Sequence, residues 1–200
     1  MSVELSESHQ NHIRVTFKGA ELPGVRITSS DFDSCTFERC ILTEAALSHC
    51  RFTNCKFMAC DLSLLSAPNC RFVDVEFLDS KLAGVDWTVV GSTKTDRLLF
   101  SAAFDRCALD YSSFFGLRLK RLSNCSGLEV DFSEADLTGA DCQRTDFTGA
   151  KFLHTNLSGA NFVGAKGYAI DLTANKAKKA KFSYPEAMSL LSAFDVVVEY

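Results

Sequence analysis

A five-residue repeat of large apolar residues constrains this chain more than any other feature of its sequence. Taken in steps of five from Phe32 to Trp87, 10 of 12 positions are Phe or Leu. The same step from Phe132 to Phe162 gives 6 of 7. An α-helix repeats its buried face every 3.6 residues and a β-strand every 2, so a period of five belongs to neither. The repeat must therefore be interpreted before any single element is assigned.

The order of residue types adds a second period of 20 residues. Phe, Phe, Leu, Leu from Phe32 onward is followed by Phe, Phe, Leu, Ala and then by Phe, Phe, Leu, Trp. If five residues make one side of a square coil, four units complete a turn and equivalent residues of successive coils stack. This predicts an all-β, four-sided solenoid whose coils pair like parallel strands about 4.8 Å apart. The predicted core ladder is Phe32, Phe52, Phe72, Phe37, Phe57, Phe77, Leu42, Leu62 and Leu82.

Small residues occupy a second repeat position, two residues before each large one. Eight of the nine cysteines lie there, among them Cys35, Cys40 and Cys50. We expect these side chains to fill a narrow interior as small apolar residues, because a larger side chain would crowd it. A spacing of five sends neighbouring cysteines to different sides of the coil, so we predict free buried thiols and no metal site.

The five-residue register breaks after Trp87, and we expect this core side chain to fill the interior as a wedge where the coil is interrupted. Phe104 follows it by 17 residues, three repeats plus two, and the 13 residues from Leu119 to Phe132 restore the earlier register. The stretch 88–101 has a polar centre and is interpreted as a projecting loop. It is either a solvated insertion or a contact surface, because apolar residues flank its cationic tip. The candidate contact residues are Thr93, Lys94, Thr95, Asp96, Arg97, Leu98 and Leu99.

Residues 183–200 change pattern and form a C-terminal segment. Ser183 and Glu186 have the spacing of a capping box, Pro185 suits a first helical turn, and apolar residues follow at i, i+3, i+4 and i+7. We predict a short amphipathic helix and then a strand at 196–198. The segment either closes the last coil or pairs with a second copy across a two-fold axis, and we favour the homodimer. The predicted dimer interface is Ala187, Leu190, Leu191, Phe194, Val196, Val197 and Val198.

The chain carries a net charge of −4, and its carboxylates are densest over residues 129–146. The predicted acidic face consists of Glu129, Asp131, Glu134, Asp136, Asp141 and Asp146. An acidic rod can resemble DNA to a DNA-binding enzyme, but B-DNA of the same length, roughly 38 Å, carries on the order of 22 charges. The resemblance must therefore come from shape and local charge. The lysines at 176, 178, 179 and 181 form one basic patch, which on an acidic chain does not predict nucleic-acid binding.

Other function classes find no support in the composition. No apolar run approaches the roughly 20 residues of a membrane span, and the first 30 residues show no export signal, so we expect a cytoplasmic protein. The four histidines are scattered, and no HExxH, GxSxG or phosphate-binding glycine loop occurs. We therefore expect a protein that is not an enzyme and has no cofactor.

The segments ADLTG (135–139), TDFTG (145–149), TNLSG (155–159) and ANFVG (160–164) resemble pentapeptide-repeat proteins. The match covers most of residues 15–182. The resemblance implies a right-handed quadrilateral β-helix over residues 1–182, interrupted by the loop at about 88–101. Residues 183–200 then add the C-terminal helix and strand.

Within that family the chain looks most like the Qnr-type quinolone-resistance proteins and the immunity proteins against topoisomerase poisons such as albicidin. Three segments carry this resemblance. WTVVGSTKTDRLLFS (87–101) lies where that group has a larger projecting loop, YPEAMSLLSAFDVVV (184–198) is similar to its dimerisation segment, and CDLSLLS (60–66) matches related sequences. The register runs unbroken from Phe32 to Trp87, so a second, earlier loop is missing, which places the chain nearer the immunity proteins.

The resemblance implies a homodimer that binds bacterial DNA gyrase, with topoisomerase IV as a second target. It would relieve the trapping of cleaved DNA by a poison such as a fluoroquinolone, in antibiotic resistance or self-immunity, and the loop would destabilise the drug-bound complex. The alternative is an interaction scaffold of the same family with a different protein partner, because a fold does not fix a function. No direct contact with nucleic acid or a membrane is expected.

Overall fold

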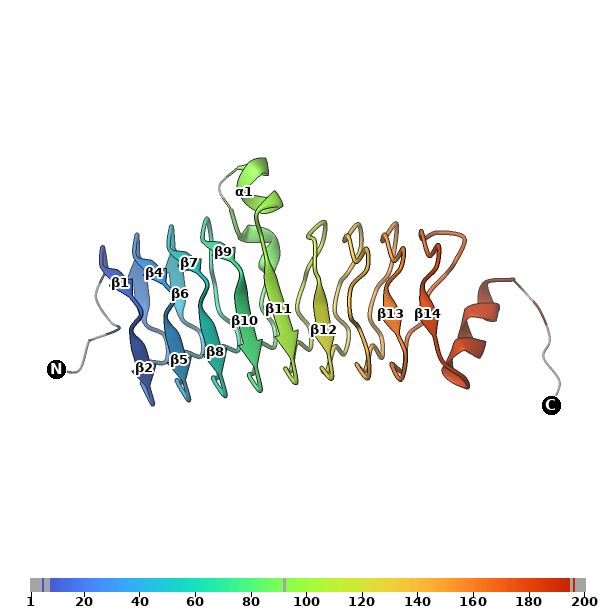
Figure 1. Ribbon diagram of the computed structural model, residues 1–200, viewed down its shortest axis with the longest axis horizontal. Coiled ribbons are helices and arrows are strands. Elements are labelled where there is room, and N and C mark those ends of the chain that lie inside the picture. The colour runs from blue at the N-terminus through green and yellow to red at the C-terminus, as the bar shows by residue number, and fades with distance from the viewer. Residues whose placement is uncertain (1–4, 6–7, 92, 195, 197–200) are drawn as a thin grey trace.

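The computed structural model describes residues 5, 8–91, 93–194 and 196, which form a straight rod of stacked coils (Figure 1). In each five-residue unit an inward apolar residue lies between two outward residues, as Phe32 lies between Asp31 and Asp33. The next residue turns the corner with a positive φ, such as the 56° of Ser34. Four units close one coil, and the chain forms an all-β solenoid of about nine turns with little helix.

The four sides of the rod, named A to D in chain order, consist of short parallel strands. Side A contains β1 (Asn11–Ile13), β4 (Asp31–Asp33), β7 (Arg51–Thr53) and β9 (Arg71–Val73). Side B contains β2 (Thr16–Lys18), β5 (Thr36–Glu38), β8 (Lys56–Met58), β10 (Val75–Leu78), β11 (Ala102–Asp105), β12 (Arg121–Ser123), β13 (Asn161–Phe162) and β14 (Lys181–Phe182). Side D begins with β3 (Arg26–Thr28) and β6 (Ala46–Ser48), and side C consists of single bridges from Glu21 to Lys166.

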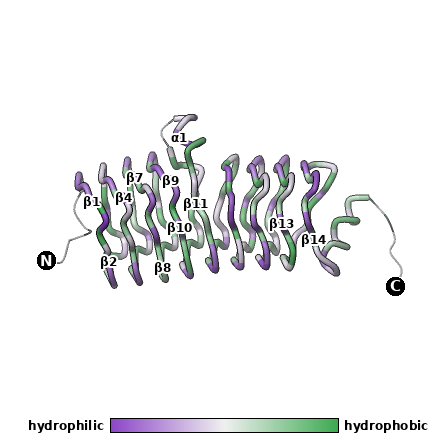
Figure 2. The backbone as a smooth tube through the Cα atoms, viewed as in Figure 1, coloured by the Kyte–Doolittle hydropathy of each residue, from purple (hydrophilic) through white to green (hydrophobic). Residues whose placement is uncertain are grey.

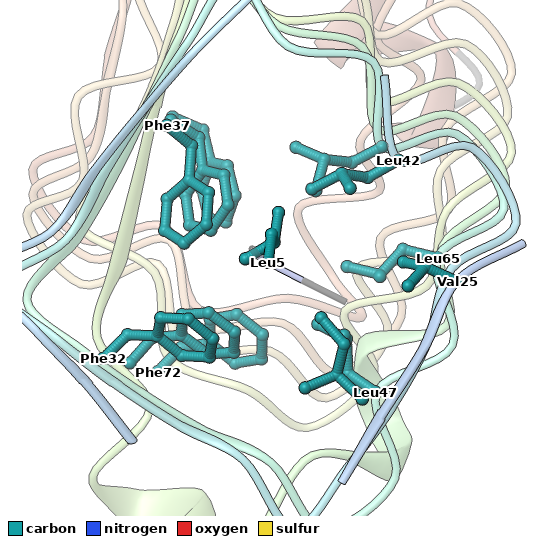
Figure 3. A pocket seen from close by; sticks show the side chains of 13 residues that line it. Leu5, Val25, Phe32, Phe37, Leu42, Leu47, Leu65 and Phe72 are labelled. Atoms are coloured by element: carbon teal, nitrogen blue, oxygen red, sulfur yellow. The ribbon is translucent and has the colours of Figure 1, made fainter. Parts of the chain in front are cut away.

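The core ladder is buried and stacked as the repeat predicts. Its stacks are Phe32, Phe52 and Phe72 on side A, Phe37, Phe57 and Phe77 on side B, and Leu42, Leu62 and Leu82 on side C. Successive phenylalanine rings in a stack are nearly parallel, with centroids 4.3 to 5.0 Å apart. Figure 3 shows the two phenylalanine stacks facing Leu42 and Leu47, with Leu5 between them. The cavity between these stacks is only about 10 Å³, so the interior of the first coils is close-packed.

The small interior residues also connect one coil to the next by hydrogen bonds. The Cys60 thiol donates to the carbonyl of Phe37, one coil earlier, at 3.3 Å. Ser80 occupies the same position in the following coil, and its hydroxyl accepts from the Cys60 N–H at 3.0 Å. All nine cysteines are buried with free thiols, as predicted. Their description as small apolar fillers was incomplete, because the thiols bond to the backbone at the corners, where strand pairing stops.

Two coils differ from 20 residues in length. Phe77 pairs with Phe104, 27 residues later, and Phe104 with Leu122, 18 residues later. The five-residue register therefore returns, as predicted, but the two coils together add five residues, which is one side of the square. Phe132 consequently stacks on Phe114 of side D, with ring centroids 5.6 Å apart, and not on side A, where Phe32 lies.

Three short helices complete the described structure. They are η1 (Trp87–Val89), α1 (Lys94–Leu98) and η2 (Glu186–Phe194). Hydrophobic and hydrophilic residues alternate along every coil, whereas η2 is mainly hydrophobic or neutral (Figure 2). None of the helices within the described ranges has the length and apolar character that crossing a membrane requires.

Candidate functional site: the insertion and the C-terminal end

The insertion takes the place of side A in one coil. Its first end is held by the Gly91 N–H, which donates to the Cys70 carbonyl at 2.9 Å. Its last end is held by the Ser101 N–H, which donates to the Phe72 carbonyl at 2.9 Å. Between these two points the chain leaves the rod and forms α1, which stands clear of the coils (Figure 1). The predicted loop at 88–101 is therefore a projection that contains a helix.

The helix α1 is closed at its start by a capping box. The Thr93 hydroxyl accepts from the Asp96 N–H at 3.1 Å, and the Asp96 carboxylate accepts from the Thr93 N–H at 3.2 Å. A helix of five residues is not stable by itself, so these bonds and the contacts below it hold its shape. Gly91 has a φ of +76°, and a Cβ there would lie 2.9 Å from the Arg97 nitrogen, so only glycine allows the chain to pass so close to α1.

An ion pair fastens α1 to the rod. The Arg71 guanidinium, from β9, lies 2.8 Å from the Asp96 carboxylate, whose side chain is only 5% exposed. Below this pair Phe100 and Trp87 are buried with ring centroids 5.7 Å apart, so the insertion has a small apolar base and Trp87 lies at the break. Asp96 was predicted as a contact residue, and this is wrong, because the carboxylate is buried and anchors the helix.

The outer surface of the insertion presents apolar side chains next to a cation. Leu98 is 74% exposed and Leu99 is 51% exposed. Thr93, Lys94 and Thr95 are exposed as well. Arg97 is half-buried, and its guanidinium donates to the Phe115 carbonyl at 3.3 Å. Leu98 is the last residue of α1 and Leu99 is its C-cap, so the two leucines together form an exposed apolar edge.

A groove of about 650 Å³ separates α1 from the coils that follow it. Its lining residues are Gly91, Thr93, Lys94, Arg97, Leu98, Phe115, Gly116, Arg118, Glu134 and Asp136. Both signs of charge face it, and Arg118 pairs with Asp136 at 3.5 Å. The groove thus extends the exposed apolar edge of α1 into a mixed polar surface on the rod.

The acidic residues of the 129–146 segment do not share one face. Asp136 bridges to Asn156 on side A, Asp141 to Asn161 on side B, Asp146 to Lys166 on side C and Asp131 to Lys151 on side D. A spacing of five places each aspartate on a different side, so the predicted acidic face is instead a ring around one coil, with Glu129 and Glu134 at its corners. These aspartates also build turns, since Asp136 and Asp146 each accept from a backbone N–H two residues later at 3.0 Å.

The C-terminal segment closes the last coil with a 3₁₀ helix. The predicted capping box is wrong, because Ser183 and Glu186 bond elsewhere. Ser183 accepts from the Gly164 N–H at 2.9 Å and Glu186 accepts from the Gly167 N–H at 2.7 Å, both on the preceding coil. Burial and the nearby Glu186 carboxylate raise the pKa of Tyr168, beneath this segment, to about 12.

The predicted dimer interface divides into two sets of residues. Leu190 is buried and Ala187 packs on the core, so these two side chains cover the solenoid's own end. Leu191 is 37% exposed and Phe194 is 49% exposed. Val196 is exposed and outside any strand, and Val197 and Val198, the other residues of the predicted strand, lie outside the described residues.

Two family models match the sequence and identify the family. Residues 30–114 match the family described as "Pentapeptide repeat region", and residues 122–166 match "Pentapeptide repeats (8 copies)". The two matches together cover more than half of the chain, and they stop on either side of the 18-residue coil's short corner. The chain is a pentapeptide-repeat protein. Among curated proteins the comparison found no match.

Solved structures similar to this pentapeptide-repeat protein include QnrB1, a plasmid-mediated fluoroquinolone resistance protein. One trypsin-treated variant of QnrB1 is 18% identical, with a TM-score of 0.56, and the alignment covers 94% of this chain and 100% of that one. A second trypsin-treated variant is also 18% identical, with a TM-score of 0.55 and the same coverage. At this identity the similarity shows the shared fold.

Two residues that hold the insertion of this pentapeptide-repeat protein were missed from the sequence. Arg71 and Phe115 occupy ordinary outward repeat positions, and their contacts with the insertion come from residues 25 and 18 positions away. No local spacing indicates such partners. In contrast, counting in steps of five around a four-sided coil is enough to predict the acidic ring. For metals, the part of the chain that the structure describes contains no group of three His, Cys, Asp or Glu side chains that could hold an ion.

Proposed function

We propose that this pentapeptide-repeat protein binds bacterial DNA gyrase, with topoisomerase IV as a second target, and protects it from topoisomerase poisons. The observation that carries the proposal is the projecting pair Leu98 and Leu99, exposed beside Lys94 on a helix that Arg71 anchors to the rod. The similarity in fold to a fluoroquinolone resistance protein, over nearly the whole chain, supports this choice of partner.

In this proposal the protein acts by binding, and the rod contributes rigidity. The stacked core and the ion pair at its base hold α1 in one position, so little conformational freedom is lost when the tip enters a cleft of the enzyme. The leucines supply apolar contact area and Lys94 supplies a charge that can meet a carboxylate or phosphate. Binding of the tip favours the state of the enzyme in which the drug-trapped, cleaved DNA is released. The acidic ring spans one coil, so the proposal rests on the tip and on shape more than on DNA-like charge.

We also propose that the protein is a homodimer through its C-terminal end. Leu191 and Phe194 remain exposed after Ala187 and Leu190 have covered the coil, which leaves an apolar surface for a second copy. A two-fold pairing there would match the two-fold symmetry of a type II topoisomerase.

A supercoiling assay with gyrase, a fluoroquinolone and increasing amounts of this protein tests the proposal. We expect supercoiling to recover and cleaved DNA to fall, and Leu98→Ala/Leu99→Ala to lose at least tenfold in potency. The matched control, Ile13→Ala/Leu64→Ala, removes two aliphatic side chains that are more than half exposed on coils before the insertion, and should keep full potency. If the parent protein rescues neither gyrase nor topoisomerase IV, the proposal is wrong and the scaffold alternative with another protein partner takes its place.

A further inference from the structure

Four lysines lie close together on the last two sides of the solenoid before η2. Lys176 and Lys178 lie on side A, Lys179 turns the corner with a φ of 61°, and Lys181 starts β14 on side B. All four are exposed, and within the described ranges none of them is in an ion pair. Their charges repel one another across a few residues, so the arrangement has an electrostatic cost that a polyanion would relieve.

The surface beneath these lysines is neutral and polar. Lys176 pairs with Asn156 and Lys181 pairs with Asn161, and Gly159 lies below Lys179 at the corner. On sides A and B, directly below the lysines, the next carboxylates are two coils away at Asp136 and Asp141, which is roughly 10 Å, about one Debye length at 0.1 M salt. Asp171 and Glu186 lie nearer in the chain, five residues before Lys176 and five residues after Lys181, but neither forms an ion pair with a lysine within the described ranges. The lysines are therefore not neutralised by the protein, and the amides below them add hydrogen-bond donors.

The lysines also reverse the sign of the charge at this end of the rod. Residues 147–186 contain six lysines and only two carboxylates, Asp171 and Glu186, so they carry a net +4 on a chain of net −4. The coil before them is the acidic ring. The argument from overall charge against nucleic-acid binding does not apply to a surface on which the positive charge is segregated in this way.

We propose that Lys176, Lys178, Lys179 and Lys181 form a binding surface for the phosphate backbone of double-stranded DNA. Lysine ammonium groups bind phosphates as point charges without reading sequence, and B-DNA presents one charge per about 1.7 Å of its axis. The four lysines lie on both sides of one corner, and the small residues Asn156, Gly159 and Asn161 below them leave room for a duplex to approach. The surface goes beyond the proposed function, because it requires no topoisomerase.

Fluorescence anisotropy with a labelled 20-base-pair duplex and the full chain tests this surface. We expect binding at 50 mM salt. The logarithm of the association constant should fall with the logarithm of the salt concentration at a slope of about −3.6, the value for four neutralised phosphates. The association constant should therefore fall about 150-fold between 50 and 200 mM salt. Replacing all four lysines by Gln should weaken binding at least tenfold and remove most of the slope. The control replaces Lys18, Lys56, Lys81 and Lys166, which are ion-paired, and should change binding less than threefold for the same loss of charge.

Three results would overturn the proposal. One is no binding of the parent chain to the duplex at 50 mM salt. Another is equal loss in the two quadruple variants, both of which must keep the parent's circular dichroism spectrum and melting temperature. A third is binding to phosphatidylserine vesicles without binding to the duplex, which would make the lysines a membrane surface. Because no topoisomerase is present, each result leaves the proposed function to its own assay.

Discussion

Replacing Asp96 by Ala should release the insertion while the coils stay folded. The substitution removes the carboxylate half of the capping box at the start of α1, the hydrogen bond from the Thr93 N–H, and the 2.8 Å ion pair with Arg71. The Thr93 half of the box remains, and loss of the one hydrogen bond costs about 1 kcal/mol. The ion pair adds about 1 to 2 kcal/mol, because the carboxylate is buried but Arg71 is 40% exposed to screening solvent. The detached state should therefore gain about 2 to 3 kcal/mol, a rise of roughly 30- to 150-fold in its population.

Trypsin provides the assay, because Lys94 and Arg97 lie inside the insertion. When opening is fast compared with cleavage, the cleavage rate follows the open population, so Asp96→Ala should be cut roughly 30- to 150-fold faster there. Its melting temperature should stay within a few degrees of the parent's, because the coils do not depend on α1. Release of the insertion should also weaken the protection of gyrase against the poison.

The control uses a similar ion pair one coil earlier. Arg51 and Asp31 lie 3.4 Å apart, are about half exposed and tether no helix, so Asp31→Ala should leave cleavage at the insertion unchanged. If Asp96→Ala is cut within threefold of the parent's rate, the anchor does not hold the insertion and the reasoning fails.

Three further predictions concern the core, alkaline pH and the C-terminal end. Phe57→Ala removes a ring stacked on Phe37 and Phe77 and should lower the free energy of unfolding in urea by about 3 to 5 kcal/mol. The control Phe115→Ala removes a partly exposed ring and should lower it by less than about 1 kcal/mol. Equal losses would contradict the stacked core. Burial raises the pKa of Cys55 to about 11 and that of Tyr168 to about 12, above their ordinary values near 9 and 10. Both groups contribute fully to the stability of the folded state below pH 9. The free energy of unfolding should fall by up to about 1.4 kcal/mol per pH unit for each group, between pH 9 and 11 for Cys55 and between pH 10 and 12 for Tyr168. A flat profile to pH 10.5 would refute the burial of Cys55. Leu191→Asp/Phe194→Asp should give a monomer by light scattering with an unchanged melting temperature, and a persistent dimer would place the interface elsewhere.

Most of the fold could be predicted from the sequence because the residues that determine each five-residue unit lie within that unit. The inward Phe or Leu, the small residue before it and the corner residue are all local, so the core stacks follow from counting. The position of the insertion follows from the same count, since Phe104 cannot be reached from Trp87 in whole repeats.

The contacts of the insertion could not be predicted, because they join residues that no repeat relates. Asp96 looked exposed in a polar stretch, and only its distance to Arg71 shows that it is an anchor. A helix at this end was predicted from its apolar periodicity, but η2 is a 3₁₀ helix in which Leu191 and Phe194 stay exposed. The expected capping residues Ser183 and Glu186 instead bond to the preceding coil. At the C-terminal end, tertiary partners outweighed the local capping signal.

The 27- and 18-residue coils show how the surface of such a rod can change in evolution. Together they lengthen the chain by five residues. Compared with an uninterrupted 20-residue period, every outward side chain beyond the insertion therefore lies on the neighbouring side of the rod, a quarter turn away, while the inward stacks continue. A solenoid of this kind can redistribute the outward residues of one half among its sides without altering its core. Any alignment that continues the 20-residue period straight through residues 88–121 would assign each outward residue of the second half to the wrong side.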